Sequence, residues 1–436
     1  MSKKVLYIST RIFWPTNSGK KITAYFNALG MHKIYNYDVY VYAFKEVDQT
    51  YDEATKPEFI KDVLEAKKIG KLTKLKNLIF KTIFGKYSIQ SALFYSKKNA
   101  NSMKAYIDKI QPDIVILDMI RLSRYHHILK DYKGIKVINL DDLLSLRYER
   151  QYQEVNQDMQ IGGQYTKQTK GFLKKLISFN FLKRLTLKFE ASRVKHEERL
   201  TTKHFDHAYF ISEKESLIYN VNYHTQKGVS ITMGVDTTYF GENLNIPKVK
   251  NRLVFLGNYH YSANVESLKM IVDKVFPFVE SKVELLAVGP VSDEVKKKFI
   301  FNSNVIFTGE VKDLRTEVLT GEIFLVPIAY GTGIKTKVVE GLAMGMPIIT
   351  NSLGIEGLMV ENFKEVMVAD NPETIALYID KLLNDEPLRE TLGQNAKTYA
   401  LKNHTWELIW KDLEKIGFKK DEWWNFLRKS IHFYIF

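Results

Sequence analysis

The sequence predicts an α/β protein of two domains, each built on a parallel sheet. The chain has 436 residues, more than a single hydrophobic core usually organises. It opens on a strand–helix–strand pattern over residues 5–44, and a second unit of this kind starts near residue 253. Short strands that alternate with helical patterns are typical of βαβ units, in which the connecting helix makes the strands parallel.

In the first half, the β-rich run Val5–Ser9 is expected to be a central strand. A loop, a helix over 20–30 and a strand at Val39–Phe44 complete this unit. Residues 56–102 are rich in lysine and show helical spacing with one apolar side, so we expect helices there. Further strands are expected at Ile114–Leu117, Ile135–Leu140 and Ala208–Ser212, and Ala208–Ser212 is expected to close the first sheet, with Val229–Met233 following it.

The second half follows a polar linker at 241–251 and repeats the alternation. Two amphipathic patterns near the end predict helices from Pro372 to about Gly417. Strands are expected at Leu253–Leu256, Val283–Val288, Val305–Gly309, Ile323–Ile328 and Ile348–Thr350.

Composition limits the partners and the location. The formal net charge is +14, which favours acidic partners such as phosphorylated substrates, anionic lipid or nucleic acid. The chain has no cysteine, which excludes disulfides and thiolate metal sites and fits a reducing compartment. No run approaches the ~18 apolar residues that span a bilayer, and the start reads as a strand and not as a signal peptide. We therefore expect a cytoplasmic protein, with the inner face of the cell membrane as an optional location.

A glycine loop follows the apolar run Ile323–Ile328 and opens a helix that Gly345 and Pro347 end. Such a loop can hold an anion, because unpaired N–H groups and the helix dipole point at it. Lys335 and Lys337 add positive charge in the first turn, and a bound anion would help to hold them. The alternative is an ordinary βα turn with solvated lysines.

The stretch GTGIKTKVVEGLAMGMPIITNSLGIEGL resembles the donor-site block of retaining GT-B glycosyltransferases, the family-4-like group 1 enzymes, in the branch whose loop reads G-x-G-I-K-x-K. The resemblance implies a GT-B fold, with two doubly wound Rossmann-like domains facing across a cleft. It implies that Glu340 binds the nucleotide ribose. It also implies that Gly331, Thr332, Gly333, Ile334 and Lys335 face the diphosphate and the donor sugar. The broader family has a second glutamate seven residues earlier, where this chain has Thr332.

Two further segments resemble blocks of the same family. GNYHYSANVESL matches G-N-x-x-Y-x-x-N, which implies that the backbone at Gly257 and Asn258 approaches the donor phosphate. For Asn264 we expect a helix N-cap instead of a ligand contact. PTNSGKKI resembles the N-terminal glycine loop, with Gly19 as the matching residue, and a simple helix start is the alternative.

The segment VINLDDLLSLRYER resembles the family piece that ends a parallel strand with an acidic residue. Ligands bind at the carboxyl ends of parallel strands, so Asp142 is a candidate to accept a hydrogen bond from the acceptor hydroxyl or to act as its base. The equal alternative is an N-cap for the next helix. His126 and His127 have no partner at metal-ligand spacing, so we expect both at the surface.

Residues 161–203 form the most basic segment, and its apolar residues cluster on one side. A basic amphipathic helix of this kind can lie on an anionic membrane, although packing against its own domain would give the same pattern. The aromatic tail at 421–436 has the same two interpretations, since Trp423 and Trp424 suit either a protein surface or a membrane interface.

The predicted organisation is an acceptor-side domain over 1–240, a nucleotide-sugar-binding domain over 241–415 and a C-terminal helix over 416–436 that returns to the first domain or meets the membrane. The resemblance implies transfer of a sugar from a UDP- or GDP-linked donor to a glycan or lipid-linked acceptor, with retention. It implies no metal or other cofactor, and it makes Asp142 and Lys335 the candidate catalytic residues. Assembly of a cell-surface polysaccharide (capsule, O-antigen or exopolysaccharide) suits this activity.

Two other functions are alternatives to sugar transfer. Because Thr332 replaces a family glutamate, the chain is alternatively a catalytically silent scaffold or regulatory subunit that binds a nucleotide sugar at the membrane. Binding of nucleic acid ranks last, because the sequence shows no basic-aromatic motif of a known binding module.

Overall fold

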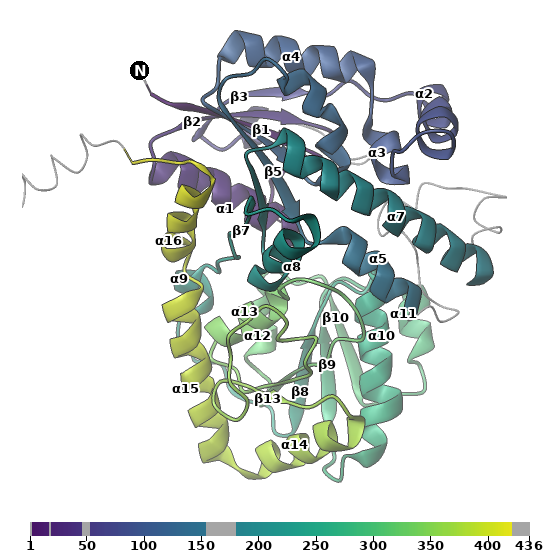
Figure 1. The fold of residues 1–436 in the computed structure, drawn as a ribbon. Helices are drawn as coiled ribbons and strands as arrows, with labels where there is room; N and C mark the ends of the chain where they lie inside the picture. Colours follow the sequence, from purple (N-terminus) through teal and green to yellow (C-terminus); the bar gives the residue numbers. More distant parts are fainter. Residues whose placement is uncertain (1, 17–18, 46–52, 154–179, 421–436) are drawn as a thin grey trace, which may run out of the picture. The chain divides into compact units, whose positions relative to one another are not determined.

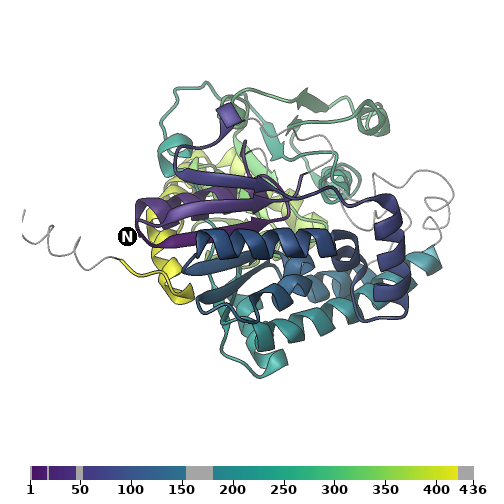
Figure 2. The ribbon, with the colours of Figure 1, turned by 90° about the horizontal axis from the view of Figure 1, so that it is seen from above.

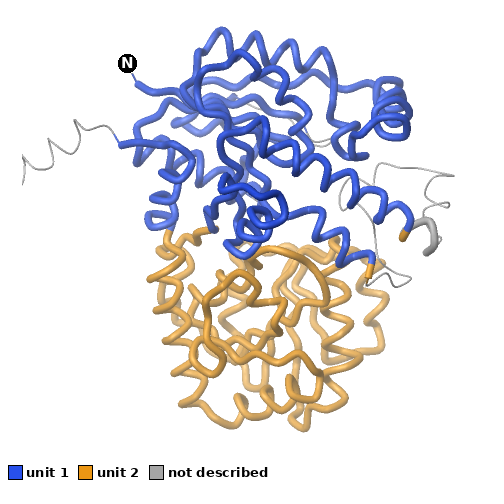
Figure 3. Tube along the Cα trace, in the orientation of Figure 1, with its two compact units in different colours: residues 1–152, 185–232, 406–436 blue, residues 153–184, 233–405 orange. Residues whose placement is uncertain are grey.

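The computed structural model describes residues 2–16, 19–45, 53–153 and 180–420 (Figure 1). These residues form two compact units, shown in different colours in Figure 3. Unit 1 draws on 1–152, 185–232 and the chain from Trp406 on, and unit 2 consists mainly of 233–405. The boundaries between the units thus lie at Met233 and Trp406. The domain boundaries predicted from the sequence were 241 and 416.

Unit 1 contains a seven-stranded sheet in the order β3-β2-β1-β4-β5-β6-β7, and all of its strand pairs are parallel. The strands are β1 (Lys4–Ser9), β2 (Asp38–Ala43), β3 (Ile60–Glu65), β4 (Ile114–Asp118), β5 (Ile135–Asp141), β6 (His207–Phe210) and β7 (Gly228–Ser230). The helices are α1 (Gly19–Lys33), η1 (Glu53–Thr55), α2 (Lys71–Asn77), η2 (Leu78–Ile83), α3 (Ile89–Phe94), α4 (Lys97–Ile110), η3 (Ile120–Leu129), α5 (Leu144–Gln153), α7 (Asn180–His204) and α8 (Glu213–Tyr223).

Both faces of this sheet are covered, as Figures 1 and 2 show for α1 and α4. Along β1 the side chains alternate between two separate buried clusters. Val5 and Tyr7 pack with α1, and Leu6 and Ile8 pack with α4. Because successive side chains of a strand point to opposite faces, this alternation identifies β1 as a fully buried central strand, as predicted.

Two predictions for unit 1 were wrong. The stretch 56–102 is not wholly helical, because Ile60–Glu65 forms the edge strand β3. Its charged residues hid the strand, and charges on an edge strand are common because they discourage pairing with other chains. The predicted strand at Ala208–Ser212 is β6, and it does not close the sheet, because the short strand β7 pairs with it on the outside.

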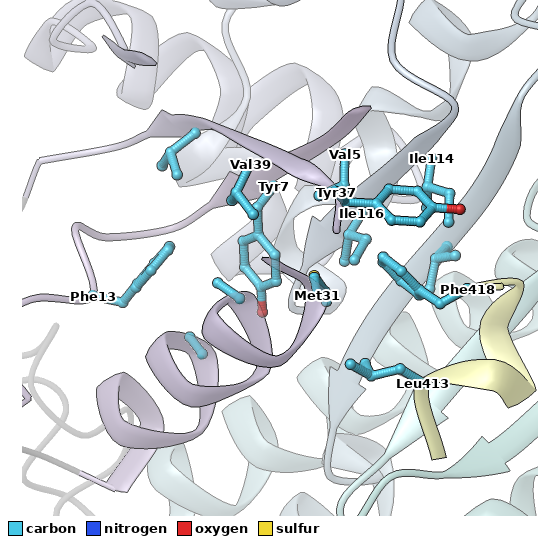
Figure 4. Close-up of a cluster of buried hydrophobic side chains, with 14 of the residues drawn as sticks. Val5, Tyr7, Phe13, Met31, Tyr37, Val39, Ile114, Ile116, Leu413 and Phe418 are labelled. Atoms are coloured by element: carbon cyan, nitrogen blue, oxygen red, sulfur yellow. The ribbon is translucent and has the colours of Figure 1, made fainter. Parts of the chain in front are cut away.

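The C-terminal part of unit 1 packs on α1. α16 (Trp406–Ile409) and η7 (Trp410–Ile416) supply Trp406, which stacks on Phe26 with ring centroids 4.7 Å apart, and Trp410, whose Nε1 donates to the Phe26 carbonyl at 2.8 Å. In Figure 4, Leu413 and Phe418 lie in the same cluster as residues of β1 and β4. The described return of the chain therefore completes the core of unit 1, and the aromatic tail from 421 on lies outside the described residues.

The described part of the basic segment packs on unit 1. In α7, Leu187 and Val194 are fully buried. Glu197 accepts hydrogen bonds from the Ser88 N–H and from Arg124, and Glu198 accepts one from the Ser145 N–H at 3.0 Å. These carboxylates hold the starts of α3 and α5, since the first N–H groups of a helix lack partners within it. For this part of the chain, packing is the interpretation that holds, and residues 161–179 lie outside the described residues.

Unit 2 contains a six-stranded parallel sheet in the order β10-β9-β8-β11-β12-β13. The strands are β8 (Arg252–Leu256), β9 (Glu284–Val288), β10 (Val305–Gly309), β11 (Ile323–Val326), β12 (Ile348–Thr350) and β13 (Met367–Val368), of which β13 was not predicted. The helices are α9 (Thr237–Phe240), α10 (Ser262–Met270), η5 (Ile271–Val275), η6 (Phe276–Phe278), α11 (Asp293–Lys298), α12 (Leu314–Val318), α13 (Thr336–Ala343), α14 (Pro372–Asn384) and α15 (Glu386–Asn403).

The two sheets share one topology. In each, the first strand of the unit lies inside the sheet, with the second and third strands on one side and the fourth to sixth on the other, where unit 1 adds the seventh strand β7. This is the order of a doubly wound Rossmann-like domain, and it confirms the predicted fold class of both units. None of the described helices combines the length and apolarity needed to cross a bilayer.

Candidate functional site

The candidate site in unit 2 lies where the strand order reverses. β8 and β11 are parallel neighbours, and from them the chain continues toward opposite edges of the sheet. One loop, at 257–261, leaves the carboxyl end of β8, and another, at 327–335, leaves that of β11. Open α/β sheets bind ligands outside the carboxyl ends of their strands at such a switch point. The fold therefore brings together Gly257, Asn258 and the predicted glycine loop.

Hydrogen bonds tie the two loops to each other. Lys337, in the first turn of α13, donates from Nζ to Asn264 Oδ1 at 2.7 Å. Asn264 Nδ2 in turn donates to the Asn258 carbonyl at 2.8 Å. The hydroxyls of Ser262 and Tyr330 lie 2.5 Å apart. The start of α13 is thus linked to the loop after β8 through side chains of α10.

The predicted N-cap role of Asn264 was wrong. The N-cap of α10 is Tyr261, and Asn264 lies inside the helix, in its first turns. Its amide group instead bridges the Asn258 carbonyl and Lys337. The sequence pattern of an asparagine before a helical run gave no sign of the second partner, which is 73 residues away.

The glycine loop needs its glycines. Gly331 has φ +146° and Gly333 has φ +70°, values that side chains with a Cβ rarely adopt. Lys335 is the N-cap residue of α13, and its Nζ donates to the Gly333 carbonyl. The loop between β11 and α13 therefore turns tightly and places a lysine at the start of the helix, as the sequence predicted.

Glu340 and Lys337 are both half-buried and lie three residues apart on α13. Burial raises the pKa of the Glu340 carboxyl, and the nearby ammonium of Lys337 opposes this rise. Burial lowers the pKa of Lys337, which the Glu340 carboxylate opposes and the Lys335 ammonium reinforces. The positive charges at the start of α13 thus repel each other in a poorly solvated place, which an anion would relieve.

Unit 1 has a polar cluster at its own switch point, between β1 and β4. Lys20 Nζ, in the first turn of α1, lies 3.1 Å from Asp118 Oδ1 and 3.2 Å from Asp141 Oδ1. Asp118 is buried and also accepts a hydrogen bond from Asn139 Nδ2 at 2.7 Å. Burial lowers the pKa of Lys20, but the two carboxylates outweigh it and hold the pKa above its usual value.

This cluster was not among the predicted site residues. The available signal was that two strands, Ile114–Asp118 and Ile135–Asp141, both end in aspartate, and they prove to be neighbours in the sheet. The carboxyl ends of adjacent parallel strands lie at the same edge, so these carboxylates had to approach each other.

The two site residues predicted for unit 1 lie near this cluster in sequence but have other partners. Gly19 is the first residue of α1, and its carbonyl accepts a hydrogen bond from Thr23 Oγ1 at 3.0 Å. Asp142 is buried, and its carboxylate forms an ion pair with Arg147 of α5. It is the preceding residue, Asp141, with φ +68°, whose carboxylate meets Lys20.

The histidine pair at 126–127 was expected at the surface, and this is correct only for His127, which is exposed. The ring of His126 stacks on His204 with centroids 3.8 Å apart, and burial lowers its pKa to about 4. Within the described residues, no group of three or more histidine, aspartate or glutamate side chains is arranged to hold a metal ion.

Residues 250–385, which contain the site in unit 2, match the family described as "Glycosyl transferases group 1". An uncharacterized glycosyltransferase of Methanocaldococcus jannaschii is 25% identical over 177 residues, which are 39% of this chain and 45% of that protein. The capsular polysaccharide biosynthesis glycosyltransferase CapM of Staphylococcus aureus is 27% identical over 160 residues, 35% of this chain and 40% of the relative. This chain therefore spans less than half of the length of these curated relatives.

Solved structures match along nearly the whole chain. Sucrose-phosphate synthase from Thermosynechococcus elongatus superposes with a TM-score of 0.65 at 14% identity, over 95% of this chain and 98% of the other. Anabaena HepE, solved in complex with UDP and glucose, superposes with a TM-score of 0.64 at 11% identity, over 94% and 98%. The fold is that of the GT-B glycosyltransferases.

Proposed function

We propose that this protein is a glycosyltransferase that moves a sugar from a nucleoside diphosphate donor to an acceptor hydroxyl. The observation that carries the proposal is the link between the glycine loop and the loop after β8, through Lys337, Asn264 and Asn258, at the switch point of unit 2. This site falls within the segment that matches the group 1 glycosyltransferases.

In the proposed reaction the bond between the anomeric carbon and the diphosphate breaks, and the leaving diphosphate takes up negative charge. Donors aimed at that charge lower the barrier most when they are already in place. Lys335 and the N–H groups of Gly331–Ile334 and of Gly257–Asn258 are the proposed donors. Lys337, held by Asn264, places a second lysine beside them, and Glu340 is proposed to bind the ribose hydroxyls.

We further propose a UDP- or GDP-linked donor and a role in cell-surface polysaccharide assembly. The structural neighbour HepE was solved with UDP and glucose, which supports the class of donor. The name of the relative CapM refers to capsular polysaccharide, which supports the class of pathway. The acceptor is then a glycan or a lipid-linked sugar.

Retention at the anomeric carbon and activity without a metal ion complete the proposal. Retention follows from the resemblance of the donor loop, and the lysines and N–H groups supply the positive charge that a metal would otherwise bring. NMR of the first-formed product tests retention, since an inverted anomer contradicts it. Loss of transfer in EDTA that added Mg²⁺ or Mn²⁺ restores contradicts metal independence.

On the acceptor side, Asp142 remains the proposed base or hydrogen-bond acceptor. Its carboxylate is paired with Arg147, so it would have to exchange that partner for the acceptor hydroxyl. Asp142→Asn tests the role, because a base is lost while a hydrogen-bond acceptor is kept. Unchanged kcat in this variant excludes a base.

The decisive experiment measures hydrolysis and transfer with a panel of UDP- and GDP-sugars, for the wild type and for Lys335→Ala. We expect about a hundredfold loss or more in the variant, typical for removal of one donor at a developing negative charge. Lys282→Ala is the matched control, since Lys282 is exposed and precedes β9 at the opposite end of the sheet. Equal activity in all three proteins contradicts the proposed role of Lys335.

A catalytically silent nucleotide-sugar-binding subunit is the second candidate. Thr332 supports it, because the broader family places a glutamate there. Thermal stabilisation by a UDP- or GDP-sugar without any turnover of that sugar, in the presence of candidate acceptors, selects this function over the enzyme.

A further inference from the structure

One helical segment of unit 1 exposes most of its large apolar side chains. α2 passes directly into η2, so residues 71–83 form one continuous helical segment. Five large apolar side chains on it and just after it are between 55% and 78% exposed, namely Leu72, Leu75, Phe80, Ile83 and Phe84. Single exposed apolar residues are normal, but a helical series of them marks a surface that binds something.

The two buried side chains of the same segment, Asn77 and Thr82, are polar, whereas Leu78 and Ile79 are half-buried. Asn77 is buried, and its Nδ2 donates to the carbonyls of Ala92 at 2.9 Å and Tyr95 at 2.8 Å. Thr82 is buried as well, and its hydroxyl donates to the Ser88 carbonyl at 3.5 Å. A helix that only covers a domain buries its apolar side and exposes its polar side. This segment buries two polar side chains and leaves five large apolar ones exposed, so its attachment to unit 1 leaves most of its apolar surface unused.

Positive charge surrounds the apolar side. Between residues 66 and 107 the sequence has no acidic residue, whereas residues 67–86 contain seven lysines. Lys81 is turned inward, with its ammonium 4.4 Å from the centre of the Tyr95 ring. The lysines that are exposed in this stretch are Lys67, Lys68, Lys71, Lys76 and Lys86.

Charge and apolarity together select the partner. A second copy of this chain would bring an equally basic surface, and a nucleic acid would match the lysines but not five exposed apolar side chains. An anionic membrane matches both, because apolar side chains enter the acyl boundary while lysines remain among the phosphates.

We propose that this lysine-flanked apolar surface docks the protein on an anionic lipid bilayer. The surface consists of the five exposed apolar residues of α2–η2 and the five exposed lysines. It is distinct from the basic segment at 161–203, whose described part packs on unit 1. Docking of this kind would give the protein access to a lipid-linked acceptor, and that use rests on the proposed function. The binding of lipid does not depend on the proposed function.

The test is flotation of the full chain with vesicles of phosphatidylcholine alone or of equal parts phosphatidylcholine and phosphatidylglycerol. The wild type should float with the anionic vesicles only, and added salt should weaken this binding. Phe80→Glu/Phe84→Glu should lower the bound fraction about tenfold or more, and Lys71→Glu/Lys76→Glu should also lower it. Phe301→Glu/Leu377→Glu, at two exposed apolar positions of unit 2, should leave it unchanged.

Two results overturn the proposal: no flotation of the wild type with either vesicle, or equal flotation of Phe80→Glu/Phe84→Glu and the wild type.

If the tail at 421–436 covers the surface, a chain that ends at 420 floats and the full chain does not. If a second copy covers it, light scattering shows a wild-type dimer that the phenylalanine variant loses. Hydrolysis of a soluble nucleotide-sugar donor distinguishes failure of the membrane proposal from failure of the proposed function. The rate of hydrolysis should be the same in Phe80→Glu/Phe84→Glu as in the wild type. Absence of hydrolysis in both proteins would count against the proposed function and not against lipid binding.

Discussion

The ammonium of Lys337 lies 2.7 Å from Asn264 Oδ1 and 4.6 Å from the centre of the Phe255 ring. The lysine therefore points from α13 toward the loop after β8 and not into water, and its positive charge is held by an amide and an aromatic face. This contact joins the two loops of the candidate donor site, and it makes Asn264 a positioning residue for both.

Asn264→Ala should loosen the donor site. The variant leaves the half-buried Lys337 and the Asn258 carbonyl without their shared partner, which costs about 1–3 kcal/mol of unfolding free energy. We expect weaker binding of UDP by calorimetry and a lower midpoint in urea. Asn395→Ala, which removes a solvent-exposed hydrogen bond to the Lys364 carbonyl of unit 2, is the control. If both variants bind UDP as the wild type does, the link between the loops has no part in donor binding.

The pH dependence of stability should report the charge of Lys337. Burial lowers its pKa from 10.5 to about 7. Between these two values the unfolded chain holds a proton that the folded chain has lost, so this residue makes the free energy of unfolding rise with pH. Lys337→Met should remove that rise, which urea titrations at about pH 7 and about pH 10 measure. An unchanged pH slope means that Lys337 keeps its proton in the folded state.

The buried ion pair at the switch point of unit 1 should be worth far more than an exposed one. Lys20→Met leaves the buried Asp118 with less compensation and should cost about 3–5 kcal/mol. In the double variant Lys20→Met/Asp118→Asn the loss should be smaller than the sum of the single losses. The exposed pair Lys104–Asp108 is the control and should contribute about 0–1 kcal/mol. Simple additivity at Lys20 and Asp118 would show that the two residues do not interact.

The packing of the C-terminal segment on α1 depends on a glycine. A Cβ on Gly30 would lie 2.2 Å from Trp410 Cδ1, so Gly30→Ala should cost about 1–3 kcal/mol although alanine favours helices. At Gly70 a Cβ meets no atom within 4 Å, and Gly70→Ala should change stability by about 0.5 kcal/mol or less. Thermal unfolding of both variants checks the difference, and equal midpoints would mean that Trp410 moves aside freely.

Local patterns predicted most of the fold. The runs Val5–Ser9 and Ile323–Ile328 are short, mostly apolar and rich in β-branched and aromatic residues, which identifies a buried strand from neighbouring residues alone. β3 escaped because an edge strand is buried on one side only, so Ile60–Glu65 carries charges that interrupt the run. The Gly331–Lys335 loop was predictable for the same reason as the central strands, since its conformation depends on residues within a few positions of each other.

The amino-acid sequence alone determined two α/β units, the glycine loop that starts α13 and the positive charge beside it. Tertiary structure alone decided which side chains meet: Lys20 with Asp118 and Asp141, and Lys337 with Asn264. It also decided that α2–η2 buries the polar Asn77 and leaves Phe80 and Phe84 exposed. The physical reason is the separation along the chain between the residues that interact. Strands, turns and helix starts depend on adjacent residues. These contacts instead depend on the order of the strands and on which face of a helix meets hydrogen-bond partners from distant parts of the chain.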